Sequence, residues 1–375
     1  MNGSDRLMGA REWWSAVARG RVRPSGVGAA LEGCLVVLSV LYGMGSAVSL
    51  WVRSARPARA GVPVISVGNL VVGGTGKTPL VVHIARLLAD GGRRVAVVSR
   101  GHGRRSRGVL VVSRGDGPIV PWTEAGDEPY LIALLTKGVP VLVAARRADA
   151  ARAAVADWGA DAILLDDGFQ HTALARDLDI VAVDAGFPLG NGHALPAGAL
   201  REHPLGIGRA DLIVATRCDR ARGGAGLVAR TLGPLAPRAP IVETRMAPSE
   251  LWDVRSGATV AAGELRGTPA LALCGIADPE GFAATARDAG LSVVGEMVYP
   301  DHHAYRSSDL AAVAERAREI GAGVIVTTEK DAVRLSGWSP PARLIALGIE
   351  LEVTRGRALL TEAIEKALRW GDAHG

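Results

Sequence analysis

Residues 62–88 read VPVISVGNLVVGGTGKTPLVVHIARLL and combine an apolar strand, a glycine-rich loop and an amphipathic helix. Leucines and an isoleucine recur at helical spacing over residues 80–88, directly after the loop. Strand, glycine loop and Lys-Thr at a helix start are the features of a P-loop, whose backbone N–H groups bind phosphate oxygens. The strict P-loop pattern has glycine where this chain has Val71. The stretch therefore predicts a nucleotide-phosphate site with one departure from the pattern.

Within this P-loop, Lys77 is expected to contact the β- and γ-phosphates and to take part in the reaction. The Thr78 hydroxyl is expected to ligate Mg²⁺, and the helix N-terminus adds a favourable dipole. The alternative is a structural glycine turn that binds no nucleotide. The residues expected to bind ATP are Val71, Val72, Gly73, Gly74, Thr75, Gly76, Lys77 and Thr78.

Two carboxylates, Asp166 and Asp167, end the apolar run AILLDD at 162–167. A buried strand that delivers carboxylates to the phosphate-binding edge of a sheet is typical of a magnesium site. The alternative is that the two aspartates cap a turn. The sequence leaves open which of them contacts the metal directly. Gly168-Phe169-Gln170-His171 follow, and we expect Gln170 and His171 to contact the substrate.

Apolar, β-branched runs alternate with helical stretches from residue 62 onward, which predicts α/β lobes with parallel sheets covered on both faces. The Gly/Pro/Ala-rich residues 222–240 are predicted to be a loop, and the short strand-like pieces in 241–268 a β-ribbon. We expect two α/β/α lobes joined by that ribbon. The predicted organisation is an N-terminal helical segment 1–60, a P-loop lobe 61–240, the ribbon 241–268 and a smaller α/β lobe 269–375.

Residues 33–52, GCLVVLSVLYGMGSAVSLWV, carry no charge. About 20 helical residues span about 30 Å, the thickness of a bilayer's hydrocarbon core. A helix that spans the membrane and one that lies in its interface both fit this segment. A cleavable signal peptide and a helix buried inside the protein would also fit it. Arginines flank both ends, so the positive-inside rule gives no orientation.

Composition sets broader limits. The chain has 375 residues, 48% of them hydrophobic, and a formal net charge of +5 that comes mainly from arginine. Arginine suits phosphates and anionic head groups, although GC-rich coding also enriches it. No run of like charge or basic-aromatic pattern indicates a nucleic-acid partner. The three cysteines match no metal or redox spacing.

Seven motifs occur together and in order: VGNLVVGGTGKTP, SRGHGR (99–104), GDEP (126–129), LDDGFQH (165–171), PAGALRE (196–202), PDHH (300–303) and TTEKDAVR (327–334). Together they resemble the tetraacyldisaccharide 4′-kinases of lipid A biosynthesis. The resemblance implies phosphate transfer from ATP, with Mg²⁺, to the 4′-hydroxyl of a tetraacylated glucosamine disaccharide 1-phosphate. It also implies attachment to the cytoplasmic face of the inner membrane of a Gram-negative bacterium.

The resemblance assigns Asp127 of GDEP as the base that takes the hydroxyl proton, assisted by His302 of PDHH rather than His303. A carboxylate–imidazole pair suits this task because the imidazole orients the carboxylate and shares its proton. Asp127 also fits a helix N-terminus. The two residues are far apart in the chain, and we expect them to lie on different lobes and to meet when the lobes close.

Further candidates for substrate contacts follow apolar strands, where ligand sites of α/β proteins form. They are Arg100, Asn191, Arg201 and Glu202. Arg201 suits an anionic head group or the transferred phosphate because arginine binds oxyanions with two parallel hydrogen bonds. Lys330 and Asp331 are expected to form an internal ion pair rather than to act directly.

Two other functions fit parts of the chain. A nucleotide-dependent switch or metallochaperone would use the P-loop and the sequence TRCD at 216–219. Against it, Val72 stands where dimeric relatives of that class carry a second lysine. A soluble small-molecule kinase is disfavoured by the uncharged N-terminal segment. Nucleotide turnover that requires a lipid acceptor would distinguish a glycolipid kinase from both.

Overall fold

A computed structural model describes residues 27–261 and 263–374, together with Trp14, residues 16–18, Gly20 and Val22. The arginines at positions 19, 21 and 23, which precede the apolar segment, lie outside the described residues. The chain divides into two compact units. Unit 1 contains Met1–Arg100, Arg146–Arg245 and Val353–Gly375, and unit 2 contains Gly101–Ala145 and Met246–Glu352.

Unit 1 is built on a parallel sheet in the order β7-β6-β1-β5-β2. Its strands are almost wholly buried because both faces are covered, as their continuous apolar sequences require. The strands are β1 (Val64–Gly68), β2 (Val95–Ser99), β5 (Ala162–Asp166), β6 (Leu178–Asp184) and β7 (Leu212–Thr216).

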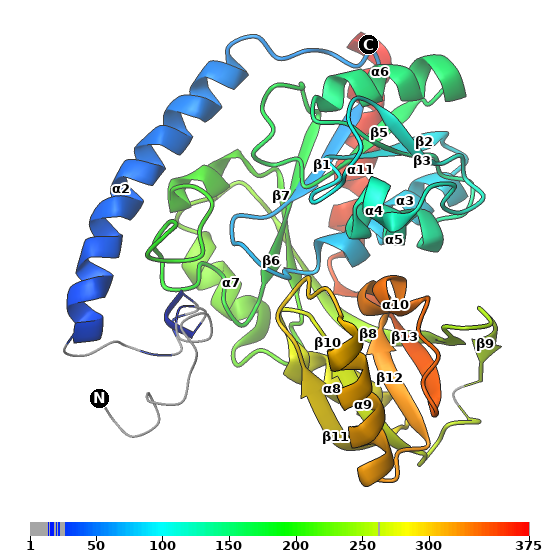
Figure 1. The fold of residues 1–375 in the computed structure, drawn as a ribbon. Coiled ribbons are helices and arrows are strands. Elements are labelled where there is room, and N and C mark those ends of the chain that lie inside the picture. The colour runs from blue at the N-terminus through cyan, green and yellow to red at the C-terminus, as the bar shows by residue number, and fades with distance from the viewer. Residues whose placement is uncertain are drawn as a thin grey trace. The chain divides into compact units, whose positions relative to one another are not determined.

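Four helices pack on this sheet (Figure 1). α3 lies against β1, β2 and β5, α6 against β2, α7 against β7, and α11 against β1 and β6. The helices are α3 (Lys77–Asp90), α6 (Arg147–Trp158), α7 (Gly224–Leu232) and α11 (Arg357–His374). A long N-terminal helix, α2 (Val27–Ser54), and a short 3-10 helix, η1 (Pro204–Arg209), complete the unit.

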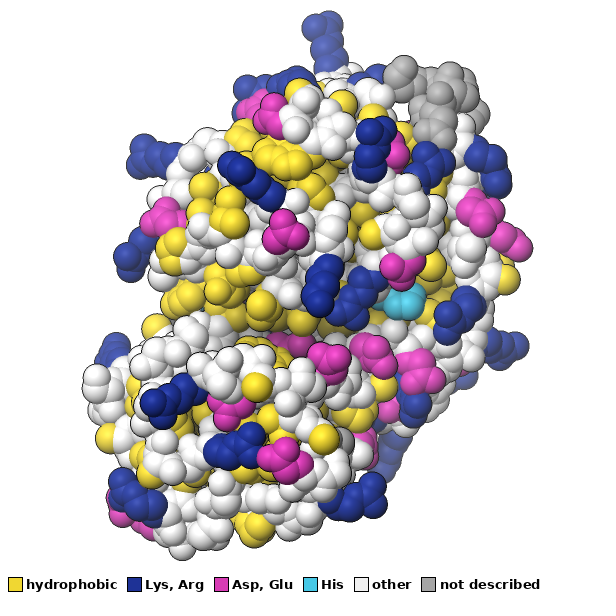
Figure 2. All heavy atoms as spheres, turned by 90° about the vertical axis from the view of Figure 1, so that its right-hand side faces the viewer, with side chains coloured by type: hydrophobic (Ala, Val, Ile, Leu, Met, Phe, Trp, Pro, Cys, Tyr) yellow, Lys and Arg dark blue, Asp and Glu magenta, His cyan; other side chains and the backbone are white. Residues whose placement is uncertain are grey.

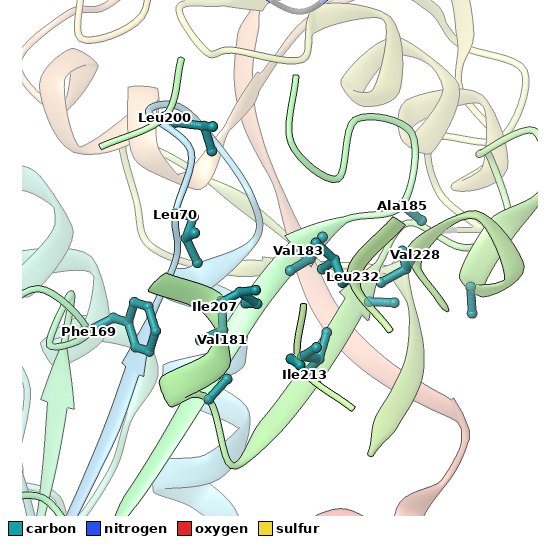
Figure 3. Packing of buried hydrophobic residues seen from close by; sticks show 14 residues of the cluster. Leu70, Phe169, Val181, Val183, Ala185, Leu200, Ile207, Ile213, Val228 and Leu232 are labelled. Atoms are coloured by element: carbon teal, nitrogen blue, oxygen red, sulfur yellow. The ribbon is translucent and has the colours of Figure 1, made fainter. Parts of the chain in front are cut away.

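The core beneath the P-loop joins several loops of unit 1 (Figure 3). Leu70 of the P-loop, Phe169 and Leu200 are all buried and belong to one apolar cluster with the ends of β6 and β7. Gly68 is required here because a Cβ at this position would lie 2.5 Å from the Cβ of Phe169. The Arg209 guanidinium lies 4.5 Å from the centre of the Phe169 ring. This packing sets the positions of the loops that carry the polar groups described below.

Unit 2 contains parallel strands in the order β11-β10-β12-β13, the last being β13 (Arg343–Arg355), and an antiparallel pair, β3-β4. Its strands are β10 (Pro269–Cys274), β11 (Ser292–Val298), β12 (Val324–Thr328), β3 (Leu110–Ser113) and β4 (Val141–Val143). Its helices are α4 (Trp122–Ala125), α5 (Asp127–Leu135), α8 (Pro279–Asp288), α9 (Ser307–Glu319) and α10 (Glu329–Leu335). α5 packs directly against α10, so the segment after β2 belongs to the same unit as the C-terminal sheet.

Two long neighbouring strands, β8 (Ile241–Asp253) and β13 (Arg343–Arg355), each contribute residues to both units. The short strand β9 (Thr259–Val260) pairs with β8 through Leu251↔Val260. The ribbon expected in 241–268 is therefore made mainly by β8 beside β13. Pairing with a strand so distant in the chain leaves no mark on the local sequence pattern.

The α/β fold class and the principal strands predicted from the sequence are confirmed. The prediction of a loop across 222–240 is wrong, because this segment contains α7. Its glycines suggested a loop, but Val228 and Leu232 form a buried face that packs on β7. The two units also divide the chain differently from the boundaries predicted above, since 101–145 groups with unit 2 and 353–375 with unit 1.

Candidate functional site

The P-loop connects the end of β1 to the first residue of α3 and is held by its own polar groups. Buried Asn69 donates from Nδ2 to Thr75 Oγ1 at 3.0 Å and to the Val71 carbonyl at 2.5 Å. Its Oδ1 accepts from Lys77 Nζ at 3.1 Å. Gly73 and Gly76 have φ values of 116° and 81°, which favour glycine. The loop is therefore shaped by an asparagine that the motif itself does not include.

The segment after β7 also holds the P-loop. Thr216 Oγ1 donates to the Thr75 carbonyl at 2.9 Å, and Arg217 Nη1 donates to the Gly74 carbonyl at 2.8 Å. Arg217 also pairs with Asp184 at 2.5 Å. Two consecutive carbonyls of the loop are thus bound by TRCD, the sequence considered above as a base-reading motif. The loop's carbonyl positions are fixed from outside the loop.

Asp167 is the acceptor on which two cations of unit 1 converge. Lys77 Nζ lies 2.6 Å from Asp167 Oδ1, and Arg201 Nη1 lies 2.9 and 2.8 Å from its two oxygens. Burial alone would raise the pKa of Asp167, but the charges and hydrogen bonds of Lys77 and Arg201 outweigh it and lower the pKa. Asp167 also has a φ of 54°, a conformation unusual for a residue with a side chain.

Asp166 has a different environment from its neighbour. It is buried, and its Oδ2 accepts from Ser99 Oγ at 2.8 Å. Asp166, Asp167 and Thr78 lie at the end of β5 and at the start of α3. Two carboxylates and a hydroxyl form the kind of oxygen donor set that fits Mg²⁺ shared with nucleotide phosphates. The assignment of these three residues to the metal stays a prediction.

Several residues predicted to contact the substrate are bound to neighbouring protein groups. Gln170 Nε2 donates to the Asn69 carbonyl at 2.9 Å and to Glu202 Oε1 at 2.8 Å. Glu202 is 3% exposed and forms a bidentate ion pair with Arg209, with N···O distances of 2.8 and 2.9 Å. These contacts tie together the P-loop and the loops that carry Phe169 and Arg201, so Gln170 and Glu202 act at least as scaffold.

Asn191 is also engaged within its own loop. Its Nδ2 donates to the Ala197 carbonyl at 2.9 Å, and its Oδ1 accepts from the His193 N–H at 3.1 Å. These two bonds close the loop that leads into PAGALRE. The predicted substrate role of Asn191, like those of Gln170 and Glu202, stays untested by this geometry.

A cationic cluster forms around His171. Burial, followed by the charges of nearby arginines, lowers the pKa of His171 to about 4. Burial and the neighbouring charge of Arg100 lower the pKa of Arg147 to about 10, against the opposing effect of Asp167 and Asp166. The positive side chains that affect His171 are Arg147, Arg53, Arg176 and Arg100. Asp179 pairs with Arg176, and Asp166 and Asp167 offset part of the charge at Arg147, so the positive charge that remains suits an anionic ligand.

A second polar cluster lies wholly within unit 2. His302 Nδ1 lies 2.9 Å from Asp127 Oδ2, and Arg334 Nη2 bonds the same oxygen. Lys330 Nζ lies 3.0 Å from His302 Nε2 and 3.1 Å from Asp301 Oδ1. Because a lysine ammonium only donates, His302 Nε2 must accept, which leaves Nδ1 as the N–H that donates to Asp127.

The expectation that Asp127 and His302 lie on different lobes is wrong. Both belong to unit 2, because α5 packs against α10 and carries Asp127 to the end of the C-terminal sheet. Their hydrogen bond forms within one unit and needs no closure. His302 has a φ of 61°, and the neighbouring His303 instead bonds Asp309 at 2.9 Å and stacks on Tyr299.

The ion pair expected between Lys330 and Asp331 is also replaced by other contacts. Lys330 pairs with Asp301, and Asp331 pairs with Arg334 at 3.3 Å. Neighbouring helical residues point in different directions, so a pair one position apart is poorly placed to meet. Burial alone would raise the pKa of Asp127, but the His302 bond and the charges of Lys330 and Arg334 lower it.

Sequence reasoning missed several residues that contact or surround the predicted site residues of both units. Asn69, Ser99, Arg147, Arg209 and Arg334 all contact or surround predicted site residues. Arg147 lies in ordinary helical sequence and is distinguished only by its burial, whereas Arg334 ends the motif TTEKDAVR, which assigned it no role. Among the described residues, Asp167, Arg217 and His302 are the non-glycine residues with positive φ. Asp167 contacts Lys77, Arg217 contacts the P-loop and His302 contacts Asp127. Backbone strain is usually retained at functional sites, so these three positions agree with the predicted site.

α2 is apolar and mostly exposed. Within residues 28–54, a window of 18 residues has a mean hydropathy of 1.9, and 6% of that window is buried. Trp51 is 74% exposed and Met44 63%. The helix contacts the rest of unit 1 through Thr172 Oγ1, which donates to the Leu50 carbonyl at 3.1 Å, and Ser46 Oγ, which lies 3.4 Å from the Arg201 carbonyl. It is the one helix among the described residues with the length and composition of a membrane span.

The surface shown in Figure 2 carries both signs of charge. Lys and Arg side chains are interspersed with Asp and Glu side chains on this face rather than gathered in a single patch. The expectation that the chain has no nucleic-acid partner stays a prediction.

Comparison with known proteins gives a consistent result. The family described as Tetraacyldisaccharide-1-P 4'-kinase matches residues 31–369. A tetraacyldisaccharide 4'-kinase from Anaeromyxobacter dehalogenans (strain 2CP-C) is 44% identical over 362 residues, which cover 95% of this chain and 93% of that protein. One from Pelobacter propionicus is 40% identical over 363 residues, covering 95% and 98%. The crystal structure of LpxK from Aquifex aeolicus in complex with ATP is 29% identical with a TM-score of 0.70, covering 90% of this chain and 99% of that one.

Proposed function

The chain belongs to the tetraacyldisaccharide-1-P 4′-kinase family, and we propose that it transfers the γ-phosphate of ATP to the 4′-hydroxyl of a tetraacylated glucosamine disaccharide 1-phosphate in lipid A biosynthesis. The observation that carries the proposal is the convergence of Lys77 and Arg201 on Asp167 beside the P-loop. Two cations held next to a phosphate-binding loop suit the charge of a transferring phosphoryl group.

In the proposed reaction, the backbone N–H groups of the P-loop bind the phosphates, and Lys77 leaves Asp167 for the β- and γ-phosphate oxygens. Thr78, Asp166 and Asp167 would hold Mg²⁺, which supplies positive charge to the phosphate oxygens when bound. Arg201 then becomes available to bind the γ-phosphate or the acceptor. Asn69, Thr216 and Arg217 keep the loop in shape throughout.

Asp127 is proposed as the group that takes the proton of the 4′-hydroxyl. The Asp127–His302 bond of 2.9 Å supports a carboxylate oriented by an imidazole. Lys330 supports it further by holding His302 in the tautomer that donates to Asp127. Asp127 Oδ1 also accepts from the Glu128 N–H at 3.1 Å, so the residue begins α5 and serves the cluster at once.

The cationic cluster around His171 is proposed to bind the anionic head group of the acceptor. After burial, the charge of Arg100 is the next largest cause that lowers the pKa of Arg147, which supports a common role of these two arginines. A phosphate between them would remove that repulsion and gain charge-assisted hydrogen bonds. This gives the 1-phosphate of the acceptor a binding role in unit 1 that is distinct from the P-loop.

α2 is proposed to attach the enzyme to the cytoplasmic face of the inner membrane, where ATP and the glycolipid are both available. Its exposed apolar side chains support this role, because leaving them in water is costly. Leu41→Glu with Trp51→Glu should move the protein from membrane vesicles into the supernatant after sedimentation. Lys137→Glu, at an exposed position of unit 2, is the control. Unchanged sedimentation of the double variant would place the membrane contact elsewhere.

The reaction is tested by incubating the full chain with γ-labelled ATP and a panel of acceptors, followed by mass spectrometry. We expect label on the 4′ position of the tetraacylated disaccharide 1-phosphate, and little transfer to a lipid-free sugar. Rapid ATP turnover without any acceptor, together with no labelled lipid, would favour a nucleotide-dependent switch. Efficient labelling of a soluble sugar would favour a small-molecule kinase.

A further inference from the structure

A buried arginine, Arg334, contacts both members of the proposed Asp127–His302 pair. We propose that Arg334, held in place by Asp331, is a positioning residue that occupies Oδ2 of Asp127 and leaves Oδ1 as the oxygen that takes the acceptor's proton. This inference rests on the proposed function, in which Asp127 is the base. It adds an assignment of the reacting oxygen and two residues that set it.

The two oxygens of the Asp127 carboxylate receive different numbers of hydrogen-bond donors. Oδ2 receives two side-chain donors, His302 Nδ1 and Arg334 Nη2. Oδ1 receives only the Glu128 N–H, at 3.1 Å, among the contacts of the described residues. A carboxylate oxygen has about two lone-pair sites. Oδ2 is therefore filled, and Oδ1 retains a site for the hydroxyl of the acceptor.

The Arg334 guanidinium bridges the carboxylates of Asp127 and Asp331. The Arg334 side chain is 4% exposed and lies in α10. Nη2 faces Asp127 Oδ2 and lies 3.2 Å from His302 Nδ1, while Nη1 lies 3.3 Å from Asp331 Oδ1. Arg334 and His302 are both donors, so they do not bond each other but share one acceptor oxygen. The planar fork of arginine allows it to bridge two carboxylates in this way, which lysine cannot do.

Asp331 is wholly buried and is itself held by hydrogen bonds. Its Oδ2 accepts from the Gly275 N–H at 2.9 Å and from Thr328 Oγ1 at 2.8 Å. Gly275 follows β10, and Thr328 ends β12 and caps α10. A buried carboxylate with every oxygen engaged has a single low-energy position. Asp331 therefore fixes Arg334 relative to β10 and β12, and Arg334 in turn fixes Asp127.

The chemistry of transfer suits a base held in this way. As the 4′-oxygen forms its bond to the γ-phosphorus and the bond to the β-phosphate oxygen of ATP breaks, the hydroxyl proton moves to Asp127 Oδ1 and ADP leaves. In a loose transition state the attacking oxygen becomes acidic only late, after bonding to phosphorus has advanced. A carboxylate with a lowered pKa can then accept the proton, provided that it is already aimed at the oxygen.

Charged groups approach Asp127 from each neighbouring element. Burial opposes its ionised form, whereas His302 and the cations of α10 favour it and lower its pKa. The titratable or charged side chains on these elements include Glu128 and Tyr130 on α5, Glu124 on α4, Asp301, His302 and His303 before α9, and Glu329, Lys330, Asp331 and Arg334 on α10. Removing the Arg334 charge should therefore raise the pKa of Asp127. Activity that needs ionised Asp127 would then be lost at higher pH as the solution is acidified.

The test measures kcat and KM against pH for Arg334→Gln and Arg334→Lys in the full chain, with Arg316→Gln as the exposed control on α9. Arg334→Gln should lower kcat on the order of 10- to 100-fold, leave the KM for ATP within about two-fold, and move the acid limb to higher pH. Arg334→Lys should keep the acid limb near that of the wild type but still lose kcat, because it keeps the charge without the fork. Wild-type kcat and acid limb in Arg334→Gln would overturn the proposal.

Two further measurements separate this role from folding and from the base itself. Arg334→Ala should regain part of its activity on addition of methylguanidinium, and no regain in a variant with wild-type thermal unfolding would contradict the assignment. Asp331→Asn should slow the enzyme in the wild-type background and add little in the Arg334→Gln background, because it acts through Arg334. If Asp127→Asn remains active, the proposed base fails. If Asp127→Asn is inactive while Arg334→Gln is unaffected, only the present inference fails.

Discussion

Asp167 in unit 1 and Asp127 in unit 2 are both carboxylates whose pKa is lowered by nearby cations against the effect of burial. They differ in one partner of Asp127, Arg334, since His302 and Lys330 are 43% and 18% exposed. The side chains of Lys77 and Arg201 are 10% and 26% exposed. Among the described residues, neither forms an ion pair with a second carboxylate besides Asp167. Arg334 is 4% exposed and is fixed by the wholly buried Asp331.

This difference indicates two distinct uses of the same kind of ion pair. In the proposed reaction, Lys77 and Arg201 leave Asp167 when the phosphates of the nucleotide bind. The cations near Asp127 lie on α10, and Arg334 is held by Asp331, which accepts from residues at the ends of β10 and β12. Substitutions of Lys77 or Arg201 should therefore alter both nucleotide binding and rate, whereas substitutions in the Asp127 cluster should alter rate alone.

The largest effect is expected at the Asp127–His302 pair. Asp127→Ala and His302→Ala should each lower kcat on the order of 10²–10⁴-fold, the range typical of general-base catalysis. The double variant should be little slower than the slower single variant, because the two residues act as one unit. The dissociation constant for ATP, measured by calorimetry, should stay within a few-fold in all three.

His303→Asn is the matched control for that pair, since His303 bonds Asp309 and stacks on Tyr299 instead. It should affect thermal stability more than rate. Additive losses in the double variant would show that Asp127 and His302 have independent roles. A large loss of ATP binding in Asp127→Ala would erase the contrast between the two regions.

Lys77→Ala is expected to have the next largest effect. Loss of a cation that acts on the transferred phosphoryl group costs on the order of 10²–10³ in rate. ATP should also bind more weakly, unlike in the Asp127 variants, and Lys137→Ala on the surface of unit 2 should behave as the wild type. Single-turnover kinetics and nucleotide titration would measure both. Activity within a few-fold of the wild type would remove the P-loop from the proposed reaction.

Arg147→Gln should have a smaller and more selective effect. A lost charge-assisted hydrogen bond to the acceptor's phosphate is worth about 1.5–3 kcal/mol, or roughly 10- to 100-fold in binding. The KM for the glycolipid should rise accordingly while the KM for ATP changes little. The adjacent Arg146→Gln is the matched control, because that side chain is 80% exposed. An equal effect of both variants would argue against a specific anion site at Arg147.

The smallest effect concerns acid stability. Asp167 and Asp127 have folded-state pKa values below their unfolded values, so their ionised forms stabilise the fold above a pH of about 4. As the pH falls below that value, the unfolded state binds protons first and the free energy of unfolding decreases. Urea unfolding between pH 6 and pH 3 should show a weaker acid dependence in Asp167→Asn than in the wild type. An identical slope would mean that Lys77 and Arg201 do not stabilise ionised Asp167.

Some of the site could be predicted from local sequence. The P-loop, the carboxylates that end β5 and the alternation of strands and helices each depend on neighbours within a short segment, and the structure contains them where expected. The α7 helix was missed because its glycines suggested a loop, whereas its burial depends on β7. Arg147 and Arg334 were missed for a related reason, since their roles come from burial beside charged groups that are distant in the chain.

The sequence by itself determined the fold class, the phosphate loop and the family, because each of these depends on patterns and motifs that are read along the chain. Only the tertiary structure decided which groups share a unit. It placed Asp127 with His302 and Arg334, and it gave Lys330 to Asp301 instead of Asp331. The physical reason is that burial of apolar surface packs α5 on α10, two helices that are far apart in sequence. Charge pairs then form among whatever side chains that packing brings together.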